Sequence, residues 1–478
     1  MTTVVLAAPT VLEADLLGML QQPELAPSSV ALRVETMDGR TLAATADDKL
    51  LVPASVMKLL TTATAVDELG LEHRVHTDLV ALGGVEDGLL SGSLVLRGAG
   101  DPALGDASLS ELSLPDLLRA WAEAVRDAGI ERIEGDVVGD GRVFERKLLG
   151  RGWTWDDALW SYSAPISGLQ LDHNVGSVVL RAPEHAGEPL QRVDNLWSPC
   201  LPVDSVALSG TEESLWVDRG LGETALRVGG QLPPGGERRL RVTLPDPDLC
   251  AAELLRAALV DAGIEVGGVA RRGAASDDED GTLLHRHSSP TLGELLPLIL
   301  QHSDNLATES VARWLDPAEQ GKRFDVAEER IQQMLSAAGA SEDLTVADAS
   351  GLSRYDQLDA RSLAAVLRWG QAQPWGPAWQ DAMPVAGVSG TLSRRMKGGA
   401  AEGQVFGKTG SMTGVFNLAA YVPREDGMLV YVVLTNGVVM PRQEVRDLQD
   451  ALAERLMSPT PRDERRCGRG CQRRRGLR

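Results

Sequence analysis

The sequence predicts an α/β (α+β) protein in which an antiparallel sheet, covered by helices, is built from both ends of the chain and carries inserted β-rich domains. Residues 29–45 alternate apolar and polar side chains around Asp38-Gly39, which is a strong hairpin signal, and an apolar helical run follows them. Two strand-like runs flank residues 424–427 near the other end, and a helical pattern then continues to Met457. Because both ends supply strands and helices of the same kind, we expect them to complete one sheet.

The middle of the chain has a different texture. From about residue 72 to 283, short β-like runs alternate with glycine, proline and aspartate, and an acidic segment at 276–282 is typical of an exposed linker. This pattern predicts one or two separate β-rich domains, inserted between the two halves of the first domain.

The composition excludes some classes of protein. The chain has 478 residues, 43% of them hydrophobic, and a net charge of −21, so it is long enough for large cores and too acidic for a typical nucleic-acid-binding protein. It contains no apolar run of about 18 residues or more, and we therefore expect no membrane span. Residues 458–478 carry eight arginines and are expected to form a basic, disordered tail.

Cysteines, histidines and the first residues bear on cofactors and compartment. The four cysteines and seven histidines show no metal-ligand spacing, so we expect no metal and no cofactor. Cys200 and Cys250 suit either a disulfide bond or two buried thiols. Residues 1–10 are similar to the end of a signal peptide whose basic region and most of its apolar core are missing. This predicts an exported protein, with either a truncated export signal or another means of export.

A lysine stands in an apolar helical run at residues 51–65. Lys58 follows Ser55 by three residues, so on a helix the two side chains share one face. A lone pattern of this kind is more typical of a lysine whose stem packs while its amine reaches water. However, only six of the 47 basic residues are lysines, and lysine can lose its proton when it is desolvated, whereas arginine cannot. Lys58 is therefore a candidate base.

Two further motifs complete a set of three. Ser303-Asp304-Asn305 stands at the start of a helical pattern, and Lys408-Thr409-Gly410 leads into a strand. Taken alone, the first would be a helix N-cap and the second a turn. Ser-x-x-Lys, Ser-Asp-Asn and Lys-Thr-Gly in this order are the signature of active-site serine penicillin-binding proteins and class A β-lactamases. Together they predict a serine acyl-transfer site.

Each residue type suits one step of acyl transfer. If burial keeps Lys58 neutral, this lysine can take the proton of Ser55 and make the serine a nucleophile without a histidine. Ser303 can relay the proton to a leaving nitrogen, and Asn305 offers an amide donor and acceptor for a peptide backbone. The predicted catalytic residues are Ser55, Lys58, Ser303 and Lys408.

The Lys-Thr-Gly strand is predicted to bind the carboxylate of the substrate. Lys408 adds a fixed positive charge, and Thr409 and Ser411 supply hydroxyl groups. Gly410 keeps the strand edge open for close approach of another backbone. The backbone N–H groups of Ser55 and Ser411 are the expected oxyanion-hole donors.

The chain resembles the D-alanyl-D-alanine carboxypeptidase/endopeptidases, the class C low-molecular-mass penicillin-binding proteins. The resemblance covers nearly the whole chain before the tail and rests, besides the three motifs, on GAGDPAL, GDGRVF, SYSAPISGLQLDHN, LPLILQHSDN, DASGLSR and MPVAGVSGTLSRRM. Ala349 departs from the glycine that is common in the family. The resemblance implies a penicillin-binding, transpeptidase-like domain, split after the first motif by an inserted domain that itself contains a third domain. The implied parts are a catalytic domain at 1–71 and 284–457, an inserted β-rich domain at 72–97 and 185–283, a nested third domain at 98–184 and the tail at 458–478.

The resemblance also implies a serine-type D-Ala-D-Ala carboxypeptidase and DD-endopeptidase. Such an enzyme acts outside the cytoplasm on peptidoglycan stem peptides, through an acyl-enzyme on Ser55 that β-lactams also form. One alternative is a β-lactamase or esterase on the same fold, for which we find no carboxylate base at the spacing of class A enzymes. The other is a non-catalytic wall-binding protein, which the complete set of Ser55, Lys58 and Lys408 disfavours.

Four further residues are predicted to read the side chain of the substrate peptide. The diamino-acid side chain of a stem peptide often ends in charged groups, and a site reads such groups with opposite charges. We expect Arg354 and Asp140 to face this side chain, with Ser350 and Met412 lining the pocket. The alternative is that Arg354 forms a solvated pair with Asp356 on a surface loop.

Overall fold

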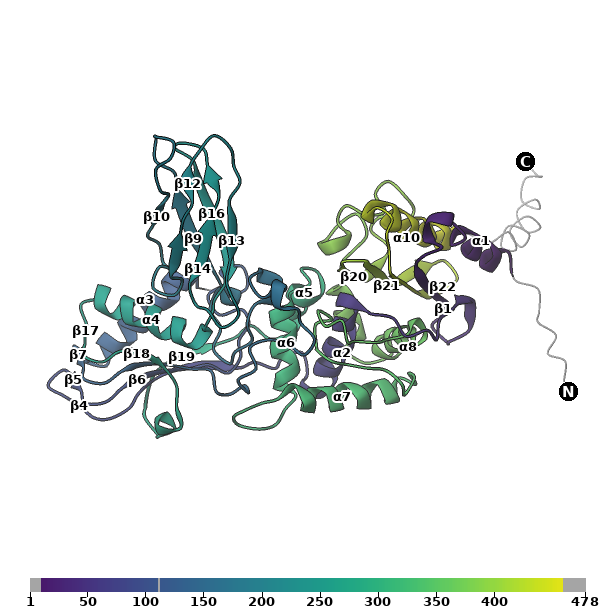
Figure 1. Cartoon of the computed structure of the whole chain (residues 1–478). Coiled ribbons are helices and arrows are strands. Elements are labelled where there is room, and N and C mark those ends of the chain that lie inside the picture. Colours follow the sequence, from purple (N-terminus) through teal and green to yellow (C-terminus); the bar gives the residue numbers. More distant parts are fainter. Residues whose placement is uncertain (1–9, 111, 459–478) are drawn as a thin grey trace, which may run out of the picture. The chain divides into compact units, whose positions relative to one another are not determined.

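The structure, a computed structural model, describes residues 10–110 and 112–458 of the chain (Figure 1). The chain divides into two compact units. The first comprises residues up to Asp67, residues 296–303 and the residues from Glu328 onward, and the second comprises residues 68–295 and 304–327. The first nine residues of the predicted export signal and the predicted basic tail after Ser458 lie outside the described residues.

The first unit contains a five-stranded antiparallel sheet with the order β2-β1-β22-β21-β20. Its strands are β1 (Ser29–Thr36), β2 (Thr41–Thr45), β20 (Phe406–Met412), β21 (Val415–Arg424) and β22 (Gly427–Asn436). β1 pairs with β22 along its whole length, from Ser29 opposite Asn436 to Thr36 opposite Leu429. The prediction that the two ends of the chain complete one sheet is confirmed.

Both predicted hairpins are present in this sheet. β1 and β2 are joined through Asp38-Gly39, where Gly39 has a φ of 84°, a left-handed conformation that glycine adopts without strain. β21 and β22 pair up to Arg424 opposite Gly427, so the turn falls on the two residues between them. Alternation marked the first hairpin, and the polar residues between two strand-like runs marked the second.

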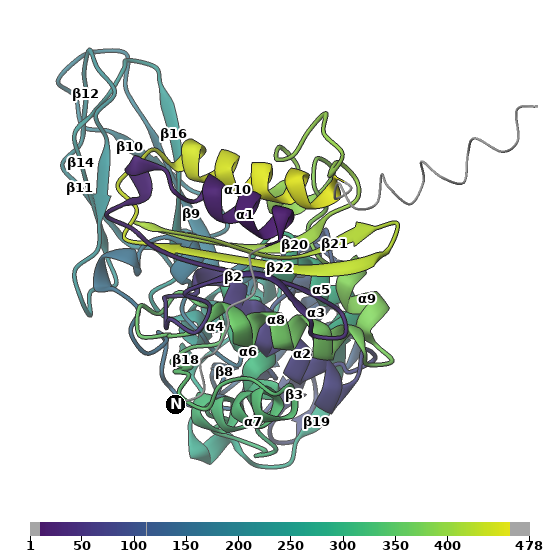
Figure 2. The same cartoon turned by 90° about the vertical axis from the view of Figure 1, so that its right-hand side faces the viewer.

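Helices cover both faces of the sheet (Figure 2). α1 (Val11–Met19) and α10 (Arg442–Met457) lie on one face, and α2 (Lys58–Leu69) and α8 (Ala360–Gln371) lie on the other. The side chains of Leu16, Leu32, Tyr431 and Leu452 are fully buried between the first pair of helices and the sheet. Further helices that lie wholly or partly in this unit are α5 (Leu292–Leu300), α7 (Phe324–Ala337) and α9 (Gly376–Asp381).

The second unit is built from smaller sheets. Its main sheet has the order β18-β8-β6-β3-β19, and a second sheet has the order β17-β7-β5-β4. The strands of these two sheets are β3 (His76–Ala81), β4 (Val85–Glu86), β5 (Leu89–Leu90), β6 (Leu94–Arg97), β7 (Arg132–Ile133), β8 (Val137–Asp140), β17 (Glu265–Val266), β18 (Ala270–Arg272) and β19 (Thr282–Ser288). The helices of this unit are α3 (Leu114–Asp127), α4 (Pro247–Asp261) and α6 (Asn305–Trp314), and α4 packs against β8 and β18.

Residues 175–243 of the second unit form three more small sheets, with the orders β10-β9-β16, β11-β14-β13 and β12-β15. Their strands are β9 (Val175–Arg181), β10 (Gln191–Val193), β11 (Val203–Ser205), β12 (Leu208–Ser209), β13 (Trp216–Asp218), β14 (Leu226–Gly229), β15 (Gln231–Leu232) and β16 (Glu237–Thr243). Short 3₁₀ helices occur in the two units at Pro23–Leu25, Ala54–Met57, Trp155–Asp157, Ser161–Ser163, Asp172–Asn174, Ala275–Asp277 and Gly390–Leu392.

The sheets divide the insertion differently from the predicted boundaries. β7 and β8, which fall in the predicted third domain at 98–184, pair in parallel with β5 and β6 of the predicted inserted domain. β19 pairs with β3, so residues 284–288 extend the main sheet of the second unit rather than the catalytic segment. Asp277, in the segment expected to be an exposed linker, is buried and accepts a hydrogen bond from Arg271 at 2.8 Å. The paired strands are distant in sequence, and local texture therefore does not reveal their pairing.

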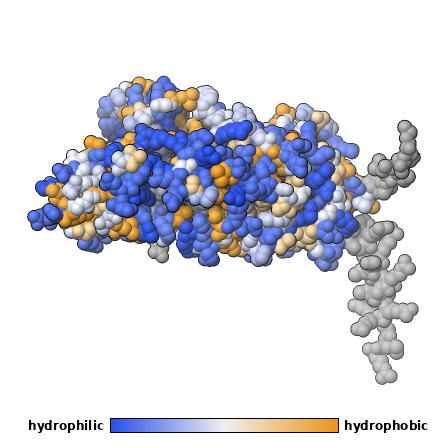
Figure 3. Space-filling model, turned by 90° about the horizontal axis from the view of Figure 1, so that it is seen from below, coloured by the Kyte–Doolittle hydropathy of each residue, from blue (hydrophilic) through white to orange (hydrophobic). Residues whose placement is uncertain are grey.

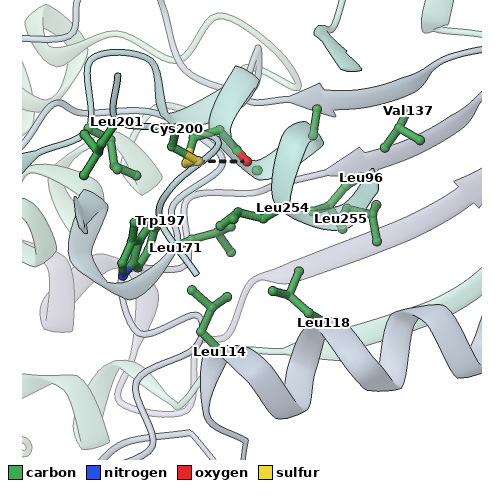
Figure 4. Packing of buried hydrophobic residues seen from close by; sticks show 14 of the residues in the cluster. Leu96, Leu114, Leu118, Val137, Leu171, Trp197, Cys200, Leu201, Leu254 and Leu255 are labelled. Atoms are coloured by element: carbon green, nitrogen blue, oxygen red, sulfur yellow. Dashed lines mark hydrogen bonds between the residues drawn. A yellow bond between two sulfur atoms is a disulfide. The ribbon is translucent and has the colours of Figure 1, made fainter. Parts of the chain in front are cut away.

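One apolar cluster packs the helices of the second unit against its strands (Figure 4). Leu114 and Leu118 of α3 lie in the same cluster as Leu254 and Leu255 of α4. Cys200, also in this cluster, forms a disulfide bond with Cys250 of α4, and both residues are buried. Of the two alternatives open from sequence, the structure has the disulfide.

Replacing Cys200 and Cys250 together by serine is expected to lower the free energy of unfolding by about 3–4 kcal/mol, because the bond closes a loop that spans 50 residues of sequence. Denaturant unfolding followed by far-ultraviolet circular dichroism measures the change. A loss under about 1 kcal/mol for the Cys200/Cys250 variant would contradict this assignment.

The surface is consistent with the charged composition. The face shown in Figure 3 is largely hydrophilic, with hydrophobic residues scattered across it. Charged residues make up 24% of the chain. Within the part of the chain that the structure describes, none of the helices is both long and apolar enough to cross a lipid bilayer.

Candidate active site

Ser55 lies on a 3₁₀ turn, η2 (Ala54–Met57), that leads directly into α2 at Lys58. Lys58 Nζ donates hydrogen bonds to Ser55 Oγ at 3.2 Å and to the carbonyl oxygen of Ser350 at 2.6 Å. The side chain of Lys58 is fully buried, so it does not extend to solvent as a snorkelling lysine would. The structure therefore brings the first two predicted site residues into direct contact.

A second serine and lysine meet in the same unit. Lys408, on β20, donates from Nζ to Ser303 Oγ at 2.9 Å and to the carbonyl oxygen of Thr409 at 2.9 Å. Lys408 is also fully buried. Ser303 has a φ of 61°, a conformation that costs a non-glycine residue about 1–3 kcal/mol and that persists where the surroundings hold it. The bond to Lys408 is one such restraint.

The electrostatics around Lys408 favour the loss of its proton. Burial, and then the charge of Lys58, lowers the pKa of Lys408 well below its ordinary value. Two buried amines repel one another when both are protonated. This environment works against the fixed positive charge expected at Lys408, because removing an ammonium group from water favours the neutral amine. An amine that gives up its proton readily is what activation of a serine without histidine requires.

β20 approaches the turn that carries Ser55 too closely for a side chain. A Cβ atom at Gly410 would lie 2.6 Å from the carbonyl oxygen of Pro53 and 3.2 Å from the backbone nitrogen of Ser55. The predicted oxyanion donors, the N–H groups of Ser55 and Ser411, belong to the two segments that meet here. Thr409 is half-buried and its hydroxyl donates to Thr391 Oγ1 at 2.8 Å, whereas Ser411 is exposed.

Two asparagines that the sequence analysis missed hold this turn in place. Asn417 Nδ2 donates to the carbonyl oxygens of Val52 at 3.0 Å and Pro53 at 2.7 Å. Asn436 Oδ1 accepts from the backbone N–H of Val52 at 2.8 Å. Both asparagines lie within strands, where asparagine is uncommon, and that is the signal that could have identified them.

Residue Ser350 joins the site through its backbone. Its carbonyl oxygen accepts the hydrogen bond from Lys58, and its own hydroxyl donates to Asp348 Oδ2 at 3.3 Å. Ser350 is fully buried. Ser350 thus lies beside Lys58, and its contact with a substrate stays a prediction.

Arg354 and Met412 lie in the same unit as Ser55. Arg354 is exposed, whereas Asp356 is fully buried. The solvated pair of Arg354 and Asp356, the alternative considered from sequence, is therefore not the arrangement in the structure. Met412 is half-buried at the end of β20. The contact of both residues with a substrate side chain stays a prediction.

Asn305 and Asp140 belong to the second unit. Asn305 begins α6, directly after the boundary that separates it from Ser303, and its Nδ2 donates to the carbonyl oxygen of Tyr162 at 2.7 Å. Asp140, at the end of β8, is buried and accepts two hydrogen bonds from the Arg142 guanidinium, at 2.9 Å and 2.8 Å. The role predicted for Asp140 toward a substrate amine stays a prediction, and Arg142 already balances its charge.

His173 is a further residue that sequence reasoning did not assign. Its Nε2 lies 2.9 Å from Asp106 Oδ2, and its Nδ1 lies 3.4 Å from Asp304 Oδ2. Burial by itself lowers the pKa of His173, but the two carboxylates outweigh burial and raise the pKa to about 9. Asp304 also caps α6 by accepting from the N–H of Ala307 at 2.7 Å. Protonated His173 thus supports the first turn of the helix that carries Asn305.

No metal-binding cluster is found among the described residues, where no three His, Cys, Asp or Glu side chains are grouped to hold an ion.

A serine that contacts a buried lysine, beside a second serine–lysine pair, on a five-stranded sheet covered by helices, defines the class of active-site serine hydrolases that work without a histidine. The D-Ala-D-Ala carboxypeptidase 3 (S13) family matches residues 12–458, and the chain belongs to this family. It is thereby a serine-type D-Ala-D-Ala carboxypeptidase, an enzyme of peptidoglycan.

Relatives agree with this assignment. The D-alanyl-D-alanine carboxypeptidase of Actinomadura sp. (strain R39) is 32% identical over 94% of this chain and 84% of its own. The D-alanyl-D-alanine carboxypeptidase DacB of Haemophilus influenzae is 27% identical over 81% of each chain.

Solved structures show the same fold. The crystal structure of penicillin binding protein 4 (dacB) from Haemophilus influenzae superposes with a TM-score of 0.80, at 24% identity, and covers 93% of this chain and 100% of that one. A structure of that protein complexed with a β-lactam superposes with a TM-score of 0.75, at 23% identity, and covers 92% of this chain and 98% of that one.

Proposed function

We propose that this carboxypeptidase removes the terminal D-alanine of peptidoglycan stem peptides through an acyl-enzyme on Ser55, with Lys58 as the base. The observation that carries the proposal is the fully buried Lys58 in hydrogen-bond contact with Ser55 Oγ. A buried amine that loses its proton can accept the serine proton, and the resulting alkoxide attacks the carbonyl carbon between the two D-alanines.

The surrounding groups support the two halves of acylation. As Ser55 Oγ bonds to the carbonyl carbon, negative charge develops on the carbonyl oxygen, and the N–H groups of Ser55 and Ser411 suit it. The peptide bond then breaks, and the leaving nitrogen takes a proton through Ser303, whose hydroxyl is held by Lys408 Nζ. Water afterwards attacks the ester and frees Ser55.

The same chemistry extends to β-lactams and to cross-linked peptides. A β-lactam presents a reactive amide carbonyl to the same serine, and a similar structure holds a β-lactam. A cross-link in which a D-alanine carbonyl is joined to another amine offers the same bond, so endopeptidase activity needs no additional group. Long-lived acylation by penicillin distinguishes this proposal from a β-lactamase, which would release it.

The disulfide supports an extracytoplasmic location. Cys200 and Cys250 are bonded and buried in the second unit, and such bonds form and persist in oxidising compartments. Peptidoglycan also lies outside the cytoplasm, so the substrate and the redox chemistry favour the same side of the membrane.

The substrate side chain is tested with paired peptides ending in D-Ala-D-Ala, with and without the charged terminus of the diamino acid. We expect wild type to release D-alanine faster from the charged peptide, and Arg354→Ala to reduce that preference by about tenfold, the equivalent of one lost charged contact. Arg40→Ala, on the exposed β1–β2 hairpin, is the control and should keep the wild-type preference. Equal turnover of both peptides by wild type would refute the side-chain contact, whereas release from neither would refute the activity itself.

A further inference from the structure

The backbone of the loop around Ser350 packs closely against the segment that carries Ser55. The carbonyl oxygen of Ser350 accepts from Lys58 Nζ at 2.6 Å, and that of Ala349 accepts from Thr61 Oγ1 at 2.7 Å. A Cβ atom at Gly351 would lie 2.0 Å from the carbonyl oxygen of Ala54, and Gly351 has a φ of 79°, so glycine is required there. The place of this loop therefore determines where the amine of Lys58 sits.

A buried carboxylate gathers the loop. Asp348 accepts hydrogen bonds from the N–H of Gly351 at 2.6 Å, from the N–H of Ser353 at 2.7 Å and from the hydroxyl of Ser350 at 3.3 Å. Its exposure is 1%, so these bonds form in a medium from which water is excluded. Three donors that converge on one carboxylate hold the loop closed.

A second carboxyl group lies behind the first. Asp356 is fully buried, and its Oδ1 accepts from the N–H of Ala347 at 2.6 Å and from the N–H of Asp348 at 3.3 Å. Its Oδ2 is buried and receives no hydrogen bond from an N–H or hydroxyl donor among the described residues. A bare anionic oxygen in that position would be costly, whereas a protonated oxygen would itself be a donor.

Two buried carboxyl groups in contact cannot both be ionised at low cost. Burial, and then the charge of Asp348, raises the pKa of Asp356 well above its ordinary value. A proton on Asp356 removes the repulsion and supplies a hydrogen bond to Asp348.

We propose that Asp348 and Asp356 share one proton, and that this carboxyl pair positions the 348–353 loop so that the Ser350 carbonyl holds Lys58 against Ser55. Both aspartates are positioning residues that act through Lys58 and touch no substrate. The inference rests on the proposed role of Lys58 as the base.

The first test uses two isosteric substitutions with opposite expectations. Asp356→Asn retains an acceptor for the two N–H groups and a donor toward Asp348, so it should keep the acylation rate with penicillin within about twofold. Asp348→Asn turns an NH₂ group toward the loop donors and should lower that rate about 100-fold, the cost of a small misplacement at a reacting centre. Asp450 lies on α10 and accepts a hydrogen bond from Arg395. Asp450→Asn removes this carboxylate, serves as the control and should leave acylation unchanged.

The second test measures the effect of the shared proton on stability and does not depend on enzyme activity. A carboxyl group whose pKa is higher in the folded than in the unfolded state stabilises the fold at pH values below its unfolded-state pKa. This stabilisation is lost as the pH rises through the folded-state pKa. The melting temperature of wild type should therefore fall with rising pH relative to that of Asp356→Asn. Lys58, which faces the loop from α2, is the same in both proteins and cancels in the comparison.

The outcomes separate this inference from the proposed function. Equal loss of acylation in Asp356→Asn and Asp348→Asn, or parallel melting curves of wild type and Asp356→Asn across pH, would overturn the shared proton. If wild type itself forms no penicillin adduct, the proposed function fails. The comparison of melting temperatures still shows whether Asp348 and Asp356 share a proton. If Asp348→Asn does not fold, the melting comparison alone carries the decision.

Discussion

Ser55→Ala should form no covalent adduct with penicillin and should keep the wild-type fold. The hydroxyl oxygen is the atom that forms the ester, so its loss removes the reaction rather than slowing it. Lys58 keeps its hydrogen bond to the Ser350 carbonyl in this variant, and little packing is lost, so the free energy of unfolding should change by no more than about 1 kcal/mol. Intact-mass measurement after incubation with penicillin, together with thermal unfolding, gives both results.

A serine elsewhere provides the control for this measurement. Ser91 is exposed in the second unit, and Ser91→Ala should be acylated as wild type is. An adduct of one penicillin on Ser55→Ala would show that another residue is the nucleophile. Loss of the adduct in both alanine variants would point to a general defect of the preparations instead.

Lys58→Arg should lower the acylation rate by about 10²–10⁴-fold, the usual contribution of a general base. Arginine keeps the positive charge but cannot release its proton, so it cannot accept the proton of Ser55. The rate of adduct formation by stopped-flow or quenched mass spectrometry measures the effect.

Lys49→Arg is the matched control, since Lys49 is exposed and donates to Ser29 Oγ at 2.8 Å. Lys58 is fully buried, so the larger arginine also strains its surroundings. Lys58→Met fills the same space without an amine and should be equally inactive, although its melting temperature should stay closer to wild type. Near-normal acylation by either Lys58 variant would remove the lysine from the mechanism.

The sequence was most informative where the chemistry is local. Ser55 and Lys58 are three residues apart, and helical geometry alone predicts that they meet. The bond between Lys408 and Ser303 spans 105 residues, and only the combination of three motifs pointed to it. Asn417 lies 365 residues from Val52, and no periodicity or spacing marks that contact.

The same distinction explains the other differences. His173 contacts Asp106 and Asp304, which the tertiary fold brings to it. Asp348 and Asp356 bind groups that are close to them in sequence, but aspartate is common in turns and caps, so the residue type alone does not mark them. The predicted domain boundaries differ from the sheets of the structure because β8 pairs with β6, although helix α3 lies between these two strands in the sequence. The tertiary fold determines this pairing, and the sequence of the strand alone does not.

Pairing of β1 with β22 has a consequence for the order in which a new chain acquires activity. Val52, three residues before Ser55, bonds to Asn436 across 384 residues, which take roughly 20–80 seconds to translate at 5–20 residues per second. Most of the second unit is contiguous, from residue 68 to 295, and is complete well before that strand exists. A chain that terminates early, before β20, would therefore contain Ser55 and Lys58 but neither Lys408 nor the asparagines that hold the serine turn. The candidate site is therefore complete only after the last strand of the sheet has been made.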